Sequence, residues 1–273
     1  MSEVGQTEAD GEAVLAAAVD AAVEVFGDDL DAAFALGSLA HGGFAPLVSD
    51  VDIAFVLRGL RPDSAERIAR VGERARTGSP LARRLSIFWT DWAGVRGEGW
   101  NGGRLPQVDR LDLVDSGRLL HGVDRRGTVV RPGHEDLVLD AARFAVSSFD
   151  ADYLGGLRAP GRLLALGVRS VTKSVLFPVR FLYTLHTGRL GLNEHAASWY
   201  RQDGRPGEPL VSAASRWRLI GVDDDVAAPE LLDRHLGGIY RELFTEYADD
   251  LAARGHADLA GQLRARGQLP ADW

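Results

Sequence analysis

The hydrophobic pattern of this chain changes near residue 130, and no other feature constrains the fold as much. Before that point, short apolar runs of strand length alternate with segments of helical spacing and with turns rich in Gly and Pro. After it, every apolar segment has helical spacing, and Gly or Pro separates one segment from the next. The pattern predicts an α+β protein, with an α/β domain over residues 1–130 and an all-helical domain over residues 131–273.

The separate elements follow from the length and composition of each run. In the first domain we expect strands at 32–36, 51–57 and 84–90, helices at 12–26 and 62–76, a long Gly-rich loop at 92–107, and a short helix and a strand within 109–122. In the second domain we expect helices at 135–157, 162–187, 193–202, 209–219, 230–254 and 256–266.

A pair of carboxylates opens the second expected strand. The first expected strand ends at Gly37-Ser38, and ten residues later comes Ser49-Asp50-Val51-Asp52. Because side chains alternate between the faces of a strand, Asp50 and Asp52 share one face. Two carboxylates on one face repel each other and gain nothing from burial, unless a cation lies between them.

The residues around this pair suit phosphoryl transfer. Mg²⁺ prefers hard oxygen ligands, usually one or two carboxylates together with substrate phosphates and water, so Asp50 and Asp52 are candidate metal ligands. Gly37 lets the backbone approach a phosphate closely, and the hydroxyls of Ser38 and Ser49 can bind phosphate oxygens. Gly-Ser by itself is common in loops, and Asp-x-Asp by itself is common on solvated strand edges. The two halves together, in this order between two expected strands, indicate a site.

The combined pattern resembles the signature of the DNA polymerase β-like nucleotidyltransferases. The resemblance implies a mixed sheet flanked by helices, Mg²⁺ bound by Asp50 and Asp52, and the triphosphate held by the loop at Gly37 and Ser38. The wider layout is similar to the aminoglycoside adenylyltransferases that modify streptomycin and spectinomycin, in which a helical domain follows the α/β domain. Residues 179–183, 187–190 and 196–199 resemble the helix–turn–helix of that second domain.

This second resemblance implies a phosphate clamp in the helical domain. In those enzymes an Arg that corresponds to Arg180 contacts the nucleotide phosphates. Lys173, the only lysine of the chain, lies two helical turns earlier and is a further candidate for nucleotide binding. A surface or inter-domain ion pair for Arg180, and a solvated position for Lys173, are the structural alternatives.

The sequence also departs from the family. Family members carry a third carboxylate on the next strand, as a metal ligand or as the base for the attacking hydroxyl, but Ser86 occupies that position here. Asp91, at the end of the same strand, and Asp112 are the candidate replacements, although either carboxylate could instead cap a helix or face solvent. The family's Lys after the Gly-x-Leu turn is also missing, and Asn193 lies near that place.

Composition narrows the class of protein. The net charge of −8 argues against non-specific nucleic-acid binding, which depends on many contacts between Lys or Arg and phosphate. The chain has no cysteine, which excludes disulfides and thiolate chemistry. Its acidic N-terminus differs from a signal peptide, and no apolar run is long enough to span a membrane, so we expect a cytoplasmic protein without a membrane partner.

These observations predict an enzyme that moves a nucleoside monophosphate from ATP or another nucleoside triphosphate to a hydroxyl of a small acceptor, with an aminoglycoside-like antibiotic as one candidate. A nucleotide-binding protein without activity and a toxin-type enzyme that modifies tRNA or protein are the alternatives. Two further features are candidates for contact with the acceptor. They are the tryptophans around the Gly-rich loop, Trp89, Trp92 and Trp100, and an acidic helix face of Glu242, Glu246, Asp249 and Asp250. A core role for the tryptophans and an ordinary solvated surface for the acidic face are the structural alternatives.

Overall fold

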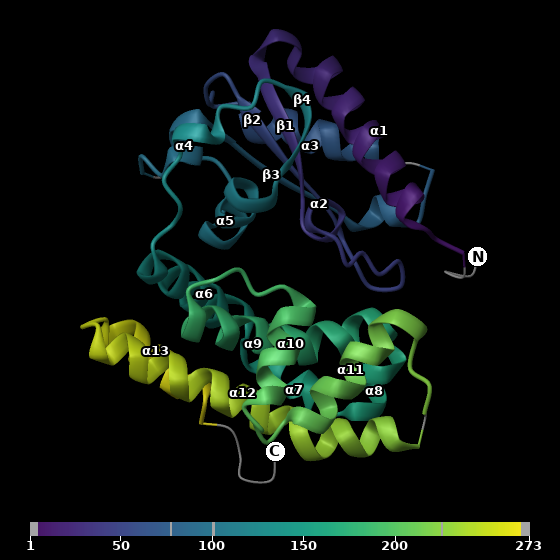
Figure 1. Ribbon diagram of the computed structural model, residues 1–273, viewed down its shortest axis with the longest axis vertical. Coiled ribbons are helices and arrows are strands. Elements are labelled where there is room, and N and C mark those ends of the chain that lie inside the picture. The colour runs from purple at the N-terminus through teal and green to yellow at the C-terminus, as the bar shows by residue number, and fades with distance from the viewer. Residues whose placement is uncertain (1–4, 77, 100–101, 225, 269–273) are drawn as a thin grey trace. The chain divides into compact units, whose positions relative to one another are not determined.

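The computed structural model describes residues 5–76, 78–99, 102–224 and 226–268. The chain divides into two compact units, Met1–Pro132 and Gly133–Trp273, and each unit is described by itself. The first unit contains a sheet and helices, and the second is helical (Figure 1).

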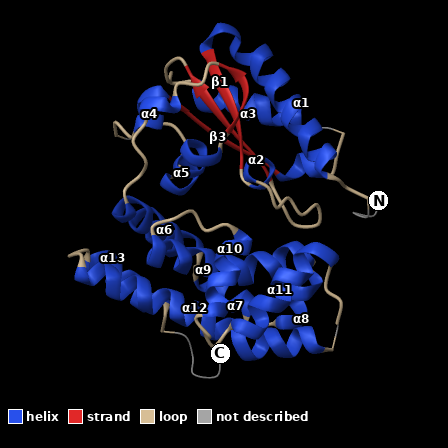
Figure 2. Cartoon of the chain, in the orientation of Figure 1, coloured by secondary structure: helices blue, strands red, loops and turns tan. Residues whose placement is uncertain are grey.

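A four-stranded mixed sheet forms the centre of the first unit (Figure 2). Its strands, in the spatial order β3-β2-β1-β4, are β3 (Leu85–Asp91), β2 (Val51–Leu57), β1 (Leu30–Leu36) and β4 (Arg118–Gly122). Strand β1 pairs antiparallel with both β2 and β4, whereas β2 and β3 are parallel. The three strands predicted from apolar runs are therefore present, and β4 is the strand expected within 109–122.

Helices cover both faces of this sheet, which explains why the central strands are apolar on both sides. On one face, α1 (Glu8–Phe26) and α3 (Ser64–Ala75) pack against the odd-numbered residues of β1 and β2. On the other face, α4 (Trp92–Arg96) and α5 (Gln107–Ser116) pack against the even-numbered residues, which include Phe34 and Val56. Asp52 is even-numbered, so it belongs to the face covered by α5.

The segment 92–107 is not the continuous loop that its glycines suggested. It begins with α4, because the Asp91 carboxylate accepts the N–H of Gly94 at 2.9 Å and so caps that helix. Gly97 ends α4 in the left-handed conformation. Arg104 then returns to the sheet and bridges Trp89. A side-chain cap and a long-range bridge therefore order a segment whose composition is typical of a loop.

The second unit is built from eight helices in the described part of the chain. They are α6 (His134–Ser148), α7 (Ala151–Leu157), α8 (Pro160–Ala165), α9 (Val168–Thr187), α10 (Asn193–Gln202), α11 (Glu208–Ile220), α12 (Ala227–Ala253) and α13 (Ala257–Arg266). Two of the six expected helices are each divided in two. Asp150 caps α7 through the N–H of Tyr153 at 2.8 Å, and Gly167, with φ of 91°, separates α8 from α9.

One continuous core of aromatic and aliphatic side chains joins these helices. Buried tyrosines of α12 reach back to α9, where the hydroxyl of Tyr240 donates to the carbonyl of Ser174 and that of Tyr247 to the carbonyl of Phe181. Burial raises the pKa of both tyrosines, so both remain protonated donors. Within the described residues, no helix combines the length and the apolar composition that crossing a membrane requires.

Candidate functional site

A glycine bend brings the end of β1 against the start of β2. Leu36, the last residue of β1, pairs with Asp52, and Gly37 then turns the chain with φ of +62° into the short helix α2 (Ser38–His41). A Cβ atom on Gly37 would lie less than 3.0 Å from the Asp52 carboxylate. The bend therefore needs glycine for two reasons, the left-handed backbone and the close approach of a carboxylate.

A second carboxylate reaches the same bend from α5. The Gly37 N–H donates to Oδ2 of Asp112 at 2.6 Å, and Asp112 is only 6% exposed. Since the amide N and the Cβ position of one residue are about 2.5 Å apart, the Asp52 and Asp112 carboxylates approach each other to within about 8 Å. The bend thus lies between two acidic side chains that are far apart in sequence.

Asp50 and Ser49 complete the entry to β2. Ser49 Oγ accepts the N–H of Ala45 at 3.0 Å, which closes a turn just before the strand. Asp50 directly precedes β2, and two-residue alternation gives it the same side as Asp52. Both carboxylates are half-buried. Ser38 is also half-buried, and its hydroxyl makes no hydrogen bond within the described part of the chain.

The strand register gives Ser86 and Asp91 different positions. Ser86 of β3 is the direct neighbour of Asp52, so the side chain beside Asp52 on the next strand is a hydroxyl and not a carboxylate. Asp91 pairs with Leu57 at the other end of the sheet, five positions further on and about 16 Å along the strand. The structure therefore does not bring Asp91 to the other aspartates; it caps α4 instead. Of the two candidate replacements, Asp112 is the one next to the bend.

The donor set fits a magnesium ion that is bound mainly through its substrate. No group of three or more His, Asp or Glu side chains in the described ranges is arranged to hold a metal. Mg²⁺ seldom uses such all-protein cages and usually takes one or two carboxylates with phosphate oxygens and water. Asp50 and Asp52, half-buried on one side of the strand beside a phosphate-compatible bend, provide the two carboxylates.

Arg180 lies on α9 of the second unit, and the following turn orients its side chain. Its Nε–H donates to the carbonyl of Gly191 at 2.5 Å, and its guanidinium lies 5.8 Å from the Phe177 ring. A Cβ on Gly191 would meet the Arg180 carbonyl at 2.5 Å, so this turn packs directly on α9. Lys173 is exposed on the same helix, and Asn193 is the first residue of α10.

Sequence reasoning missed Arg218. It lies on α11, its side chain is 4% exposed, and Nη1 is 3.6 Å from the Glu194 carboxylate. Burial lowers the pKa of Arg218, and the opposing effect of the Glu194 carboxylate offsets this only in part. The signal in the sequence was faint, because Arg216 and Arg218 flank Trp217 in one helix and only packing reveals which of the two is buried.

Comparison with known proteins bears on the fold. The sequence matches no protein-family model and no curated protein. The structure is similar to that of the spectinomycin adenyltransferase AAD(9) from Enterococcus faecialis, solved with ATP and spectinomycin. The TM-score is 0.52 at 12% sequence identity, over 93% of this chain and 98% of that chain. This chain has a nucleotidyltransferase fold. At this identity the likeness extends to the fold alone.

The acidic residues singled out on α12, Glu242, Glu246, Asp249 and Asp250, do not form an open acidic surface. Every member is ion-paired with arginine within the second unit. Arg205 contacts Glu242 at 2.7 Å and Glu246 at 2.9 Å. Arg264 pairs with Asp249 at 3.0 Å, and Arg254 pairs with Asp250 at 2.6 Å. These ion pairs offset the charge of the carboxylates, so the face offers little attraction to a cationic acceptor, and the alternative of an ordinary helix surface fits it better.

The two described tryptophans around the Gly-rich segment, Trp89 and Trp92, pack in different hydrophobic clusters. Trp92 is 8% exposed in the core beneath the sheet, and its Nε1–H donates to Asp31 at 2.9 Å. Trp89 lies within β3 and is half-buried. Trp100 lies outside the described residues. Trp92 therefore anchors α4 and does not cover an acceptor.

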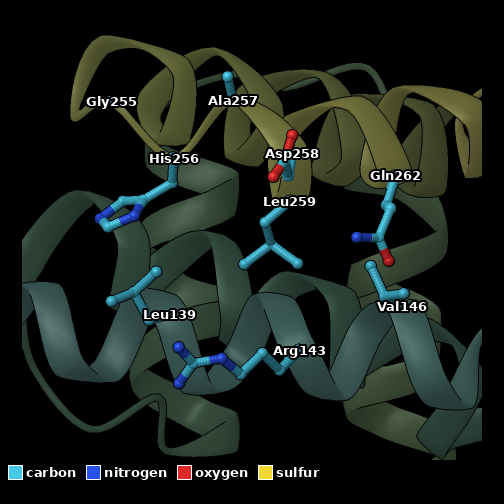
Figure 3. A pocket seen from close by; sticks show the side chains of 9 residues that line it. All are labelled: Leu139, Arg143, Val146, Gly255, His256, Ala257, Asp258, Leu259 and Gln262. Atoms are coloured by element: carbon cyan, nitrogen blue, oxygen red, sulfur yellow. The ribbon is translucent and has the colours of Figure 1, made fainter.

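An open pocket of about 560 Å³ lies between α6 and α13 (Figure 3). Leu139 and Val146 of α6 and Leu259 of α13 give it an apolar floor, and Arg143 and His256 stand at its edge. His256 Nε2 lies 2.9 Å from Glu135 and links the two helices. None of the residues predicted for nucleotide binding lines this pocket.

Proposed function

We propose that this protein is a Mg²⁺-dependent nucleotidyltransferase that moves a nucleoside monophosphate from ATP or another nucleoside triphosphate to a hydroxyl of a small acceptor. The observation that carries the proposal is the Gly37 bend, which has the Asp52 carboxylate against its Cα and the Asp112 carboxylate on its N–H. Acidic side chains gathered around a phosphate-compatible bend suit a divalent cation, because a cation between carboxylates offsets their mutual repulsion. Together with the nucleotidyltransferase fold, they support phosphoryl transfer.

Each residue has a definite role in this proposal. Asp50 and Asp52 would hold Mg²⁺, which supplies charge neutralisation for the phosphate oxygens when it is bound. Gly37 shapes the bend that would hold the polyphosphate by leaving room for the Asp52 carboxylate, and the hydroxyls of Ser38 and Ser49 donate to the phosphate oxygens. Arg180 is proposed as a further phosphate ligand, and exposed Lys173 as a weaker one.

Asp112 is proposed to replace the third carboxylate of the family. It takes the proton of the acceptor hydroxyl while the new bond forms between the acceptor oxygen and the α-phosphorus. The bond between that phosphorus and the pyrophosphate oxygen breaks, and pyrophosphate leaves. Asp112 reaches the bend from α5, whereas the register position beside Asp52 is occupied by Ser86, a weak base.

An aminoglycoside-like antibiotic is the proposed acceptor, which would make this a cytoplasmic resistance enzyme. The similar structure was solved with spectinomycin, which supports a small hydroxyl-bearing molecule. A nucleotide-binding protein without transferase activity is the second candidate, and Ser86 beside Asp52 is the observation that favours it. Modification of tRNA fits less well, since the chain carries a net charge of −8.

Two measurements on the full chain test the proposal. A thermal-shift titration with ATP, GTP, CTP and UTP, each with and without Mg²⁺, tests binding, and we expect a Mg²⁺-dependent rise in Tm. Pyrophosphate release with a panel of aminoglycosides and spectinomycin then tests transfer. Asp52→Asn keeps the shape of the side chain and should abolish both signals, whereas Asp63→Asn, at the start of α3, should leave both unchanged. A Mg²⁺-dependent shift that survives in the Asp52 variant would show that the site is elsewhere.

A further inference from the structure

Asp50 and Asp52 are held in different ways, although both are proposed metal ligands. Asp52 lies inside β2, where it pairs with Leu36 on one side and with Ser86 on the other. The ladders to both neighbouring strands therefore fix its main chain. Asp50 lies before Val51, the first residue of β2, so its position depends on the segment that leads into the strand.

That segment is a closed turn over residues 45–49. The N–H groups of Val48 and Ser49 donate to the carbonyl of Ala45 at 3.0 and 2.8 Å, and Ser49 Oγ accepts the N–H of Ala45 at 3.0 Å. Ala45 is 1% exposed and Val48 is 8% exposed, so the turn is anchored in the interior of the first unit. Because Ser49 directly precedes Asp50, a rotation of this turn moves the Asp50 carboxylate.

A side chain from another segment also holds the 45–49 turn. Arg84 is the last residue of the 3-10 helix η2 (Leu81–Arg84) and directly precedes β3. Its Nη1–H donates to the carbonyl of Pro46 at 2.8 Å, across 38 positions of sequence, and Arg84 is half-buried. The turn is therefore closed by its own hydrogen bonds and fastened to the start of β3 by a guanidinium.

The strand register brings Arg84 to the same end of the sheet as the proposed metal ligands. Strands β2 and β3 run parallel, and Val51 pairs with Leu85. Asp50 and Arg84 directly precede these two residues, so the two chains enter the sheet at the same end, with a strand spacing of about 4.8 Å. Arg84 thus reaches the turn from the strand next to Asp50.

We infer that Arg84 is a positioning residue for the metal site. By holding the Pro46 carbonyl, it keeps the 45–49 turn in the conformation that presents Asp50 for metal binding. The inference rests on the proposed function, because it takes Asp50 and Asp52 as the Mg²⁺ ligands. Mg²⁺ requires ligand oxygens at about 2.0–2.1 Å in nearly octahedral geometry, so a small displacement of one carboxylate lowers its affinity.

Two effects of Arg84 oppose each other, and their balance gives the sign of the expected result. A positive charge near the carboxylates repels a divalent cation, so charge alone predicts tighter metal binding when Arg84 is removed. Water and salt weaken this repulsion at a half-exposed site. The strict geometry of Mg²⁺ makes the placement of Asp50 the larger effect, so we expect removal of Arg84 to weaken metal binding.

The test measures Mn²⁺ binding by the full chain without nucleotide, with the free ion quantified by electron paramagnetic resonance. Mn²⁺ serves as the probe because it takes the same hard oxygen ligands as Mg²⁺. Arg84→Met keeps an apolar stem but loses the bond to Pro46, and we expect about ten-fold weaker binding. Arg84→Lys retains a charged donor and should stay within about three-fold of wild type.

Two control variants separate this role from a general loss of stability. Arg83→Met changes the exposed neighbour in η2 and should alter Mn²⁺ affinity by less than about two-fold. Arg67 makes a bond of the same kind as Arg84, since its Nη2–H donates to the carbonyl of Val25 at 2.9 Å. It also pairs with Asp29, directly before β1 and at the end of the sheet opposite Asp50. Arg67→Met should therefore lower Tm without changing Mn²⁺ affinity.

A double variant tests whether Arg84 acts through the turn. Ser49→Ala loosens the same turn by removing the acceptor of the Ala45 N–H. The combined loss of Mn²⁺ affinity in Arg84→Met with Ser49→Ala should be smaller than the product of the two single losses. Should Arg84→Met not fold, Arg84→Gln replaces it, and its shorter, neutral donor should weaken binding by at least about three-fold.

Three results would overturn the inference. They are Mn²⁺ affinity that is unchanged or higher without the Arg84 guanidinium, losses that simply multiply in the double variant, and no Mn²⁺ binding by the wild-type protein.

Failure of the inference can be told apart from failure of the proposed function. Mn²⁺ binding that needs Asp52 but not Arg84 would leave the proposed function intact and refute the positioning role. Mn²⁺ binding that needs both Asp52 and Arg84, with no nucleotide binding by the wild-type protein, would support the positioning role and refute the nucleotidyltransferase.

Discussion

The N–H of Gly37 donates to the carboxylate of Asp112 at 2.6 Å, although 75 positions separate the two residues in the sequence. This bond ties the bend after β1 to the helix that covers one face of the sheet. Asp52 lies on the same bend, close to the Gly37 Cα. Movement of any one of these residues therefore displaces the others, and the first two predictions follow from that coupling.

Gly37→Ala should inactivate the protein. The new methyl group would collide with the Asp52 carboxylate. Alanine would also have to adopt the left-handed backbone conformation, which is strained for a residue with a Cβ atom. We expect a loss of roughly 1–3 kcal/mol in the free energy of unfolding and about a 100-fold loss in kcat/KM, measured by urea denaturation and pyrophosphate release. Gly42→Ala is the control, because Gly42 has φ of 88° but no atom within 4 Å of its Cβ position. Equal losses of activity in both variants would refute the role of the collision.

Asp112→Asn should separate the charge of this residue from its hydrogen bond. The amide oxygen of Asn can still accept the Gly37 N–H, so the unfolding free energy should stay within about 1 kcal/mol of wild type. Loss of the carboxylate should lower kcat by about 100-fold, as expected when a general base is removed. Asp112→Ala, unlike Asp112→Asn, should lose about 1–3 kcal/mol of unfolding free energy, because the Gly37 N–H loses its acceptor. Full activity of Asp112→Asn would show that Asp112 anchors the Gly37 bend but is not the general base.

Gly191→Ala should weaken nucleotide binding from a position that carries no charge. The new methyl group would meet the Arg180 carbonyl at 2.5 Å and push the turn away from α9. The Gly191 carbonyl, which accepts the Nε–H of Arg180, would move away with the turn. We expect KM for the nucleoside triphosphate to rise by about ten-fold with kcat nearly unchanged, as for loss of a ground-state contact. Gly161→Ala, where no atom lies within 4 Å, should behave as wild type.

Asp124 should contribute to stability only where it is ionised. Hydrogen bonds from Arg126 hold the pKa of Asp124 below its usual value. A lowered folded-state pKa gives stability that is present above about pH 4 and is lost as the pH falls through the folded value. Because the side chain is 37% exposed, we expect Asp124→Asn to cost only roughly 0.5 kcal/mol at pH 7. Thermal unfolding should show a smaller difference in stability between wild type and Asp124→Asn at pH 3 than at pH 7. An equal difference at both pH values would contradict the stabilising role of the ionised carboxylate.

Much of the fold could be predicted from local patterns. The strands 51–57 and 85–91 and helix α10 appear at or within one residue of the ranges that apolar spacing predicts. The end of β1 directly before Gly37-Ser38 also agrees with the prediction, and the shared side of Asp50 and Asp52 stays a prediction from strand alternation. The breaks at Asp150 and Gly167 were missed, because a single side-chain cap or one left-handed glycine is a weak signal inside a helical pattern.

By itself, the sequence determined which segments are strands and helices and where two acidic side chains open a strand, because these depend on residues within a few positions of one another. Only the tertiary structure decided between Asp91 and Asp112, because that choice depends on strand register and on a hydrogen bond across 75 positions. It alone buried Arg218 and paired Glu242 and Glu246 with Arg205. Long-range packing determines which charges meet, and a one-dimensional pattern does not contain that information.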